Sequence, residues 1–315
     1  MKGYGPLDSL GSPRRAGVAT FLGLPQVTGL EGVDVACVGL PFDAAVGFRV
    51  GARFGPAALR EASRALRSGY SPVQRVAVFD RLSAVDAGDA PVVPGKVERS
   101  LALMEEMLTQ VHEAGAVPLG FGGDHSVLLA ELRAAAQRHG QLGLVSFDAH
   151  YDTWTEESDE RSTHGAVLRR AVAEGLIDPK RSSLLGMRGA VSSAADVDAV
   201  RELGFLVVPW HDLAQLGTGM VEAAVERAGG KAFLTFDVDF VDPAFAPGTG
   251  TPAVGGPSSA QALALLQGAR GLEIVGADVV EVLPSFDQSQ LTALLGVTAA
   301  YEILTLIAAG RPVAG

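Results

Sequence analysis

The stretch Leu142-Gly143-Leu144-Val145-Ser146-Phe147-Asp148-Ala149-His150-Tyr151-Asp152 joins an apolar run to a pattern of ionisable side chains. Residues 143–147 favour a buried strand, and a carboxylate, an imidazole and a second carboxylate follow at alternate positions. Alternate residues of an extended segment point the same way, so Asp148, His150 and Asp152 are expected to converge. Converging oxygen and nitrogen ligands hold divalent metals in proteins. The stretch therefore predicts a metal site at the end of a strand.

Two further fragments follow apolar runs in the same manner. Asp237 and Asp239 stand in Thr235-Phe236-Asp237-Val238-Asp239, and His125 stands in Gly122-Gly123-Asp124-His125-Ser126. An isolated Asp-x-Asp also suits strand-end caps or the metal–nucleotide motif of a glycosyltransferase. The paired glycines lack the Gly-Lys-Ser/Thr sequence of a phosphate-binding loop. Taken together, two imidazoles and four carboxylates suit two metal ions in a shared site better than one.

Short apolar runs alternate with helical patterns along the chain, which predicts a parallel sheet covered by helices on both faces. Ligands of such sheets bind beyond the carboxyl ends of the strands, where all three fragments lie. Strands are predicted at 33–40, 75–79, 116–121, 143–147, 182–187, 205–208, 232–236 and 274–280. Helices are predicted at 56–66, 97–114, 126–138, 165–173, 192–202, 219–227, 258–266 and 288–308.

Composition excludes several classes of protein. The chain of 315 residues is 48% hydrophobic and 19% charged, which indicates a globular protein with a large core. Its net charge of −11 argues against nucleic acid or an anionic membrane as a partner. A single cysteine, Cys37, rules out an intramolecular disulfide, and the N-terminus lacks a secretory pattern. We therefore expect a cytoplasmic protein.

Four other residues are weighed by position alone. His164 precedes a predicted helix and suits either catalysis or a helix start. Glu281 follows an apolar strand, where a buried carboxylate is unfavourable unless it is paired with a cation, so a functional and a structural ion pair fit equally. His112 and His139 fall within and at the end of predicted helices, and we expect them at the surface or as caps.

These residues together resemble those of the ureohydrolases, the family of binuclear manganese enzymes that includes arginase and agmatinase. The resemblance covers nearly the whole chain, and four segments look like the agmatinase branch rather than true arginase: 237–252, His164-Gly165, 177–181 and 186–189. The other matching motifs, besides the three metal fragments, are Leu40-Pro41-Phe42-Asp43, Arg49–Pro56 and Asp278–Pro284.

The resemblance implies a three-layer α/β/α sandwich on a central eight-stranded parallel sheet. It implies a single domain over 1–315, with an N-terminal extension at 1–30 packed on the domain or at a subunit interface, and homotrimers or homohexamers. The implied cofactor is two Mn²⁺ ions, although the ligand types leave Ni²⁺ and Co²⁺ open. One ion would be held by His125, Asp148, Asp152 and Asp237, and the other by Asp148, His150, Asp237 and Asp239.

The resemblance also implies a reaction, the hydrolysis of a guanidino compound to urea and an amine. Two metals can share a water and make it hydroxide at neutral pH. Glu281 would bind the planar guanidinium by paired hydrogen bonds. Asp152 would orient the nucleophile and pass its proton to the departing amine, and His164 would relay protons or position the substrate.

The loop that follows the Asp148 motif gives a prediction about the tail of the substrate, which is the part beyond the guanidino group. It lacks the serine- and asparagine-containing pattern of arginase, and its acidic segment 156–160 favours a cationic tail, unless it is simply a solvated loop. Agmatine, which would give putrescine, is therefore the first expectation. Tyr151 is unusual between the histidine and the aspartate, and with Trp154 it could narrow the pocket. Guanidinobutyrate, guanidinopropionate and other guanidino acids thus stay open as shorter substrates.

Three other functional interpretations of the sequence are left open. A formimino or other amidine hydrolase would meet a carboxylate-bearing substrate with a basic residue, such as Arg161 or Arg188. An inactive metal-binding regulatory subunit would be marked by a lost ligand, and all six are present. A single-metal hydrolase of the deacetylase type would not need both His125 and His150.

Overall fold

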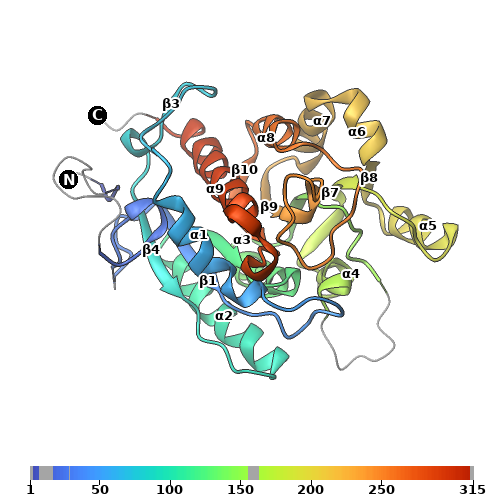
Figure 1. The fold of residues 1–315 in the computed structure, drawn as a ribbon, viewed down its shortest axis with the longest axis horizontal. Helices are drawn as coiled ribbons and strands as arrows, with labels where there is room; N and C mark the ends of the chain where they lie inside the picture. Colours follow the sequence, from blue (N-terminus) through green and yellow to red (C-terminus); the bar gives the residue numbers. More distant parts are fainter. Residues whose placement is uncertain (1–2, 7–16, 28, 155–162, 313–315) are drawn as a thin grey trace.

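The computed structural model describes residues 3–6, 17–27, 29–154 and 163–312. Within them, one open parallel sheet runs through the molecule in the order β4-β1-β5-β10-β9-β6-β7-β8 (Figure 1). Its strands are β1 (Val35–Leu40), β4 (Ala84–Asp89), β5 (Val117–Gly122), β6 (Leu142–Phe147), β7 (Ile177–Met187), β8 (Leu206–Pro209), β9 (Lys231–Asp237) and β10 (Glu273–Val280).

Helices cover both faces of this sheet and bury a separate apolar cluster on each. One layer consists of α1 (Gly55–Ser63), α6 (Trp210–Leu216), α7 (Thr218–Ala228), α8 (Ser259–Gln267) and α9 (Leu291–Ala309). The other consists of α2 (Val97–Glu113), α3 (Leu128–His139), α4 (Val167–Ala173) and α5 (Ala194–Leu203). The predicted three-layer α/β/α sandwich on an eight-stranded parallel sheet is confirmed.

The inner strands are buried on both faces, which is why they read as continuous apolar runs. All six residues of β1 and all six of β6 are buried. Polar ligands placed directly after such strands cannot move far, because the strand before them is fixed by pairing and packing on every side. The sheet therefore acts as a rigid base for the groups at its carboxyl edge.

Two predictions about the strands are wrong. The segment predicted at 75–79 does not join the main sheet; Val76–Ala77 (β3) pairs antiparallel with Tyr70–Ser71 (β2) instead. The sequence patterns also miss the edge strand β4, because it carries two aspartates and a glycine. The buried Asp86 of β4 is tolerated there because Arg60 donates to both of its oxygens, at 2.8 and 2.9 Å.

Part of the N-terminal segment packs on the domain. Phe21 and Leu24 are buried in the core. The Phe21 ring lies 4.5 Å from that of Phe121, centroid to centroid, and the Phe21 backbone N–H donates to Asp86 Oδ2 at 2.7 Å. These contacts tie the described part of this segment to β4 and β5.

Helix α9 is apolar and long enough to cross a membrane by length and composition alone. However, 83% of its most apolar window is buried inside the protein. It packs against α1 and α8 on one face of the sheet. Its composition is therefore explained as that of a core helix, which is apolar all round.

His112 departs from the prediction of a surface or capping residue. It is buried within α2, and neither ring nitrogen has a hydrogen-bond partner among the described residues. Position 112 is one helical turn beyond the buried Leu108, so the core-facing stripe of α2 includes it. Burial, and then the positive charges of His139 and Arg138, lower the pKa of His112 to about 4.

We expect His112 to make the protein less stable in mild acid. The pKa is about 4 in the folded chain and near 6.5 in the unfolded chain, so only the unfolded chain takes up the proton between these values. Stability is full above pH ~6.5 and is lost as the pH falls toward 4, by about 2 kcal/mol at pH 5. Urea unfolding at pH 7 and pH 5 measures this loss, which His112→Leu should reduce.

His211→Leu is the matched control, since His211 is exposed. It should lose stability between the two pH values as the unmodified protein does. An equal loss in the His112→Leu variant would show that another group causes the pH dependence.

Candidate metal centre

The predicted ligands gather where four neighbouring strands end. Asp148 follows β6 directly, Asp237 is the last residue of β9, and His125 begins the 3-10 turn η4 (His125–Val127) just after β5. These strands, with β10 between β5 and β9, are adjacent in the sheet. Parallel order therefore brings fragments from distant parts of the chain to the same edge.

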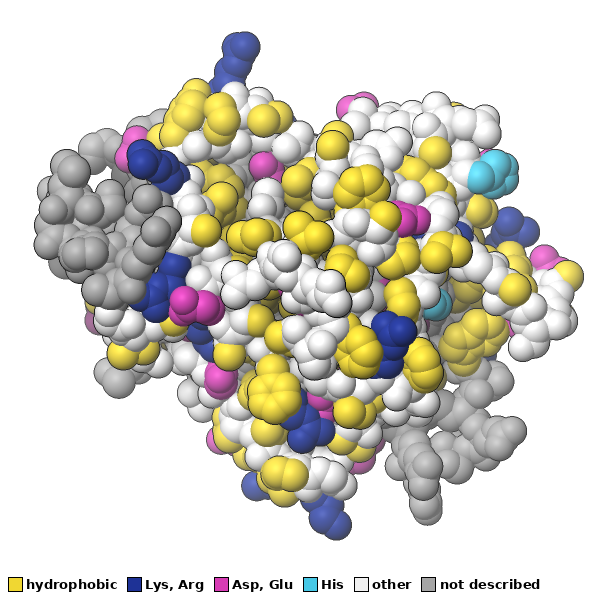
Figure 2. All heavy atoms as spheres, in the orientation of Figure 1, with side chains coloured by type: hydrophobic (Ala, Val, Ile, Leu, Met, Phe, Trp, Pro, Cys, Tyr) yellow, Lys and Arg dark blue, Asp and Glu magenta, His cyan; other side chains and the backbone are white. Residues whose placement is uncertain are grey.

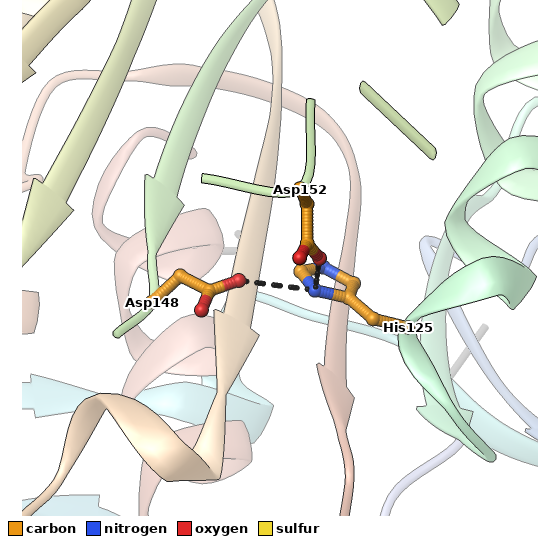
Figure 3. A group of neighbouring side chains, drawn as sticks. All are labelled: His125, Asp148 and Asp152. Atoms are coloured by element: carbon orange, nitrogen blue, oxygen red, sulfur yellow. Dashed lines mark ion pairs between the residues drawn. The ribbon is translucent and has the colours of Figure 1, made fainter. Parts of the chain in front are cut away.

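One group of ligands centres on His125. Its Nδ1 atom lies 2.8 Å from Asp152 Oδ2, 3.1 Å from Asp148 Oδ2 and 3.5 Å from Asp237 Oδ2. Figure 3 shows His125, Asp148 and Asp152 pointing toward one another from separate segments of the chain. This is a suitable arrangement for one divalent cation.

A second group lies beside the first and shares Asp148 with it. His150 Nδ1 is 3.0 Å from Asp239 Oδ2 and 3.6 Å from Asp148 Oδ1. Asp148 therefore turns one oxygen toward each group, as a bridging ligand would. Asp237 contacts only the first group by ion pairing, but its Oδ1 also accepts the N–H of Asp239 at 2.8 Å.

The chemistry of this donor set fits divalent metals. The four carboxylates are almost fully buried, and burying like charges together is unfavourable unless cations neutralise them. His125 Nδ1 is itself buried and faces three of these carboxylates, yet it makes no hydrogen bond within the described residues. The charge of Asp239 raises the pKa of His150 to about 12, against the effect of burial. The cluster thus attracts positive charge strongly at both positions.

The local backbone differs from the extended segment expected from the sequence. β6 ends at Phe147, and Asp152 has a left-handed backbone with φ of 49°. A residue other than glycine adopts this conformation at a cost of about 1–2 kcal/mol. Asp152 consequently joins the His125 group while His150 joins the Asp239 group. The three side chains meet through a turn, not through strand alternation.

Glu281 also has a left-handed backbone, with φ of 62°, directly after β10. Its Oε1 accepts the backbone N–H of His125 at 3.0 Å and lies 3.1 Å from His164 Nδ1. Its Oε2 is buried and has no partner within the described part of the chain. A Cβ atom at Gly250 would stand 3.1 Å from that oxygen, so the glycine leaves space beside it. One carboxylate oxygen is therefore fixed, and the other lies beside Gly250 without a partner among the described residues.

His164 opens the turn η5 (His164–Ala166) and is held by its backbone N–H, which donates to Ala45 O at 3.2 Å. Burial alone would lower its pKa, but the contact with Glu281, aided by the charges of Asp152 and Asp124, raises it to about 9. The structure therefore brings His164 and Glu281 together beside the metal cluster, with the imidazole protonated at neutral pH.

Trp154 lies at the outer side of this region. Its backbone N–H donates to Gly165 O at 2.9 Å, and its ring stands edge-on to that of Tyr151 with centroids 6.5 Å apart. The Trp154 side chain remains 37% exposed. The acidic segment 156–160 and Arg161 lie outside the described residues.

The sequence reasoning did not single out Asp124, which ties the site to the loop that precedes it. Asp124 is fully buried and accepts the backbone N–H groups of Ala45 and Ser126 at 3.0 and 2.9 Å. Burial, and then the charge of Glu281, raise its pKa to about 7. Asp43 closes the same loop by accepting the Gly51 N–H at 2.7 Å and pairing with Arg53. The sequence feature that could have identified Asp124 is its position between the paired glycines and the ligand His125.

Arg188 was a candidate for a basic residue that meets a substrate carboxylate, and the structure places it elsewhere. Its guanidinium donates to the carbonyl oxygens of Asp239, Phe240 and Ala253, at 2.7 to 2.8 Å. It therefore fixes the backbone behind Asp239, and its donors are occupied by the protein.

An open parallel sheet that gathers imidazoles and carboxylates at its carboxyl edge places the protein among the α/β metalloenzymes. Comparison with known proteins defines the family within that class. The Arginase family model matches residues 33–305, and the chain belongs to this family. It is therefore a hydrolase of the kind that acts on guanidino or amidino compounds, as the ureohydrolase resemblance predicts.

Individual relatives differ in what their names say they act on. The chain is 45% identical to a guanidinopropionase of Pseudomonas aeruginosa, over 96% of each chain. It is 40% identical to a mitochondrial agmatinase of Gallus gallus, over 93% of this chain and 87% of the relative. The solved structure of proclavaminate amidino hydrolase from Streptomyces clavuligerus superposes with a TM-score of 0.90 at 38% identity, covering 95% of this chain and all of that one.

Asp148→Ala should remove metal binding and activity together. The substitution deletes the carboxylate that faces both groups of ligands, so we expect fewer than two divalent metal ions per chain and at least about a thousandfold lower rate of hydrolysis. Metal content after gel filtration and an assay of guanidino-compound hydrolysis measure the two effects. Asp80→Ala is the control, because Asp80 is an exposed aspartate that is not one of the predicted ligands. Full turnover by the Asp148 variant would contradict the shared-ligand arrangement.

Proposed function

We propose that this protein hydrolyses a short guanidino acid, with guanidinopropionate as the first candidate, to urea and the corresponding amino acid. The observation that carries the reaction is the position of Glu281 beside the metal-binding cluster, with its Oε2 close to Gly250 and unpartnered among the described residues. The 45% identity to a guanidinopropionase supports the choice of tail. The aromatic pair Tyr151 and Trp154 supports a short pocket.

The six ligands would hold two Mn²⁺ ions, and their oxygen and imidazole donors suit manganese. When bound, such ions supply Lewis acidity and lower the pKa of water. The residues of the chain would do the rest. Glu281 accepts hydrogen bonds from the planar guanidinium through Oε2, while its Oε1 is held by His125 N–H and by His164. A carboxylate fixed at one oxygen presents the other in a defined direction.

Two groups near the reacting carbon would move protons. Asp152 lies within 2.8 Å of His125 and is buried, so it is placed to take a proton from the attacking water and deliver it to the departing nitrogen. His164 is protonated at neutral pH, because its contact with Glu281 and nearby acids raises its pKa to about 9. It would supply protons at the side of the site closer to Trp154.

A cation near Glu281 would favour an acidic substrate tail over the amine of agmatine. The carbonyl oxygen of Arg49 lies 3.6 Å from the position of a Cβ on Gly250, and Glu281 Oε2 lies 3.1 Å from the same position, so the backbone of Arg49 is near this carboxylate. The Arg49 guanidinium stacks over the rings of Phe286 and Phe48, 4.6 and 5.2 Å from their centroids. Among the described residues it has no acidic partner, and we propose that it meets the substrate carboxylate.

Urea release by manganese-loaded protein tests the proposed substrate. Guanidinopropionate should exceed guanidinobutyrate in kcat/KM by at least about tenfold, since one methylene in a shaped pocket is worth about 1–3 kcal/mol. Agmatine and arginine complete the panel, and metal-stripped protein is the control. If agmatine were the best substrate, the proposal of an acidic substrate tail would be contradicted. The expectation from the sequence would then hold, in line with the 40% identity to an agmatinase.

Arg49→Gln tests the tail separately from the reaction. Loss of an ion pair to the carboxylate should raise KM for guanidinopropionate about tenfold, while any turnover of agmatine should be unchanged or improved. Arg49→Lys, which keeps the charge, should have a KM for guanidinopropionate between those of the unmodified protein and the glutamine variant. An unchanged KM in the glutamine variant would assign carboxylate recognition to another residue.

We also propose that the protein self-associates, as a homotrimer or homohexamer. Val50, Phe54 and Val254 are 62%, 63% and 79% exposed, and Figure 2 shows apolar side chains spread over the middle of the face viewed. Exposed apolar side chains mark an interaction surface where they form a contiguous patch. The mass measured by light scattering in solution distinguishes a monomer from either assembly.

A further inference from the structure

A row of polar positions crosses the sheet directly beneath the metal cluster. Ser146 of β6 is the register partner of Thr235 in β9, which pairs with Asp278 in β10, which in turn pairs with Gly120 in β5. Alternate residues of a strand point to the same face, so Thr235 lies one repeat, roughly 6.6 Å, below the ligand Asp237. Polar groups in this inner position are buried on all sides and require partners from the protein itself.

Glu131 of α3 adds a second carboxyl group to this row. It is buried and contacts the carboxyl group of Asp278. A Cβ atom at Gly120 would overlap Glu131 Oε1, so only glycine at position 120 lets the carboxyl group rest on β5. Within the described residues neither oxygen of Glu131 has a hydrogen-bond donor, and Asp278 Oδ2 also lacks one. Two buried carboxyl groups in contact must share a proton, because both cannot be ionised without a cation.

The row continues from Asp278 to the metal ligand His125. Asp278 Oδ1 accepts the Phe236 N–H at 3.3 Å, and Asp278 also contacts the Thr235 hydroxyl. Thr235 Oγ1 lies 2.9 Å from His125 Nε2. The hydroxyl has one proton, so if it donates to Asp278 its oxygen must accept from His125 Nε2–H. His125 Nδ1 is then left with its lone pair, facing Asp148, Asp152 and Asp237.

We propose that Glu131 is a positioning residue: by donating its proton to Asp278 it keeps Asp278 an acceptor, and through Thr235 this fixes His125 with Nε2 protonated and Nδ1 free for a divalent cation. The pKa values of the two carboxyl groups agree with this direction. Burial, and then the charge of Asp278, raise the pKa of Glu131 well above its usual value. Burial also raises the pKa of Asp278, and the hydrogen bond from Glu131 counteracts that rise.

Removal of the Glu131 proton would allow the hydrogen bonds that link Asp278, Thr235 and His125 to reverse their direction. Without it, Asp278 is a lone buried carboxyl group whose neutral form is favoured by burial. A protonated Asp278 would donate to Thr235, and Thr235 would then donate to His125 Nε2. That arrangement places the imidazole proton on Nδ1, where it opposes the cation. Outer partners of a metal-binding histidine commonly change metal affinity by about 10–100-fold.

The test compares Glu131→Leu with Glu131→Gln, and Thr235→Val with Thr235→Ser. The leucine variant has no donor for Asp278, whereas the glutamine amide retains one; the valine variant breaks the chain of hydrogen bonds, whereas serine restores it. The readout is the dissociation constant of Mn²⁺ from initially metal-stripped protein, measured by calorimetry. Thermal unfolding of the metal-free proteins shows whether each variant is folded.

We expect Glu131→Leu and Thr235→Val to weaken Mn²⁺ binding at least about tenfold. Glu131→Gln and Thr235→Ser should stay within about threefold of the unmodified protein, since each keeps a neutral hydrogen bond. In Zn²⁺-loaded protein with ¹⁵N-labelled histidine, the protected Nε2–H signal of His125 should be present in the unmodified protein and lost or shifted in the leucine and valine variants.

Three results would overturn the proposal. The first is unchanged Mn²⁺ affinity and an unchanged ring signal in Glu131→Leu, and the second is equal weakening in the glutamine variant. If Glu131→Leu does not fold, Thr235→Val decides, and wild-type affinity in that variant is the third. These measurements do not involve a guanidino substrate, so their outcome is independent of the substrate proposed above.

Discussion

Negative charge is concentrated at the carboxyl edge of the sheet, and most of the surrounding structure serves to hold it there. Four aspartates and Glu281 meet at the ends of β10, β9 and β6, where little water reaches them. Carboxylates in such a position repel one another and lose hydration, so they require either protons or cations. The two histidines, the backbone N–H groups and the strained turns place these oxygens so that divalent cations are the best way to satisfy them.

The sequence predicts the fold and the members of the cluster well because both depend on local patterns. Apolar runs on a parallel sheet are continuous, and ligands directly after them share one edge. Features that depend on contacts between residues far apart in the sequence cannot be predicted in this way. Strand β4 looks polar until Arg60 is seen to pair with Asp86. His112 looks like a helix-surface residue, and Arg188 looks free to bind a substrate, until the packing around each is known.

The turns at the site show the same limit. Asp148, His150 and Asp152 are spaced as alternate residues of a strand, yet the strand ends before them and Asp152 has a left-handed backbone. The sequence identifies which side chains meet but not which pairs they form. Such a turn is stable only because the surrounding contacts over-determine it, including the N–H of Leu168, which donates to Asp152 O at 2.9 Å. Strain of this kind leaves no recognisable mark in residue type.

The close fit of Glu131 against Gly120 has an evolutionary consequence. Any side chain at position 120 would occupy the space of the carboxyl group, so the two positions cannot change independently. A lineage that replaced Gly120 by alanine would first have to exchange Glu131 for a shorter or differently directed residue. That exchange would alter the partner of Asp278 beneath the cluster. Drift at two interior positions that touch no substrate could therefore be restricted as tightly as drift among the ligands.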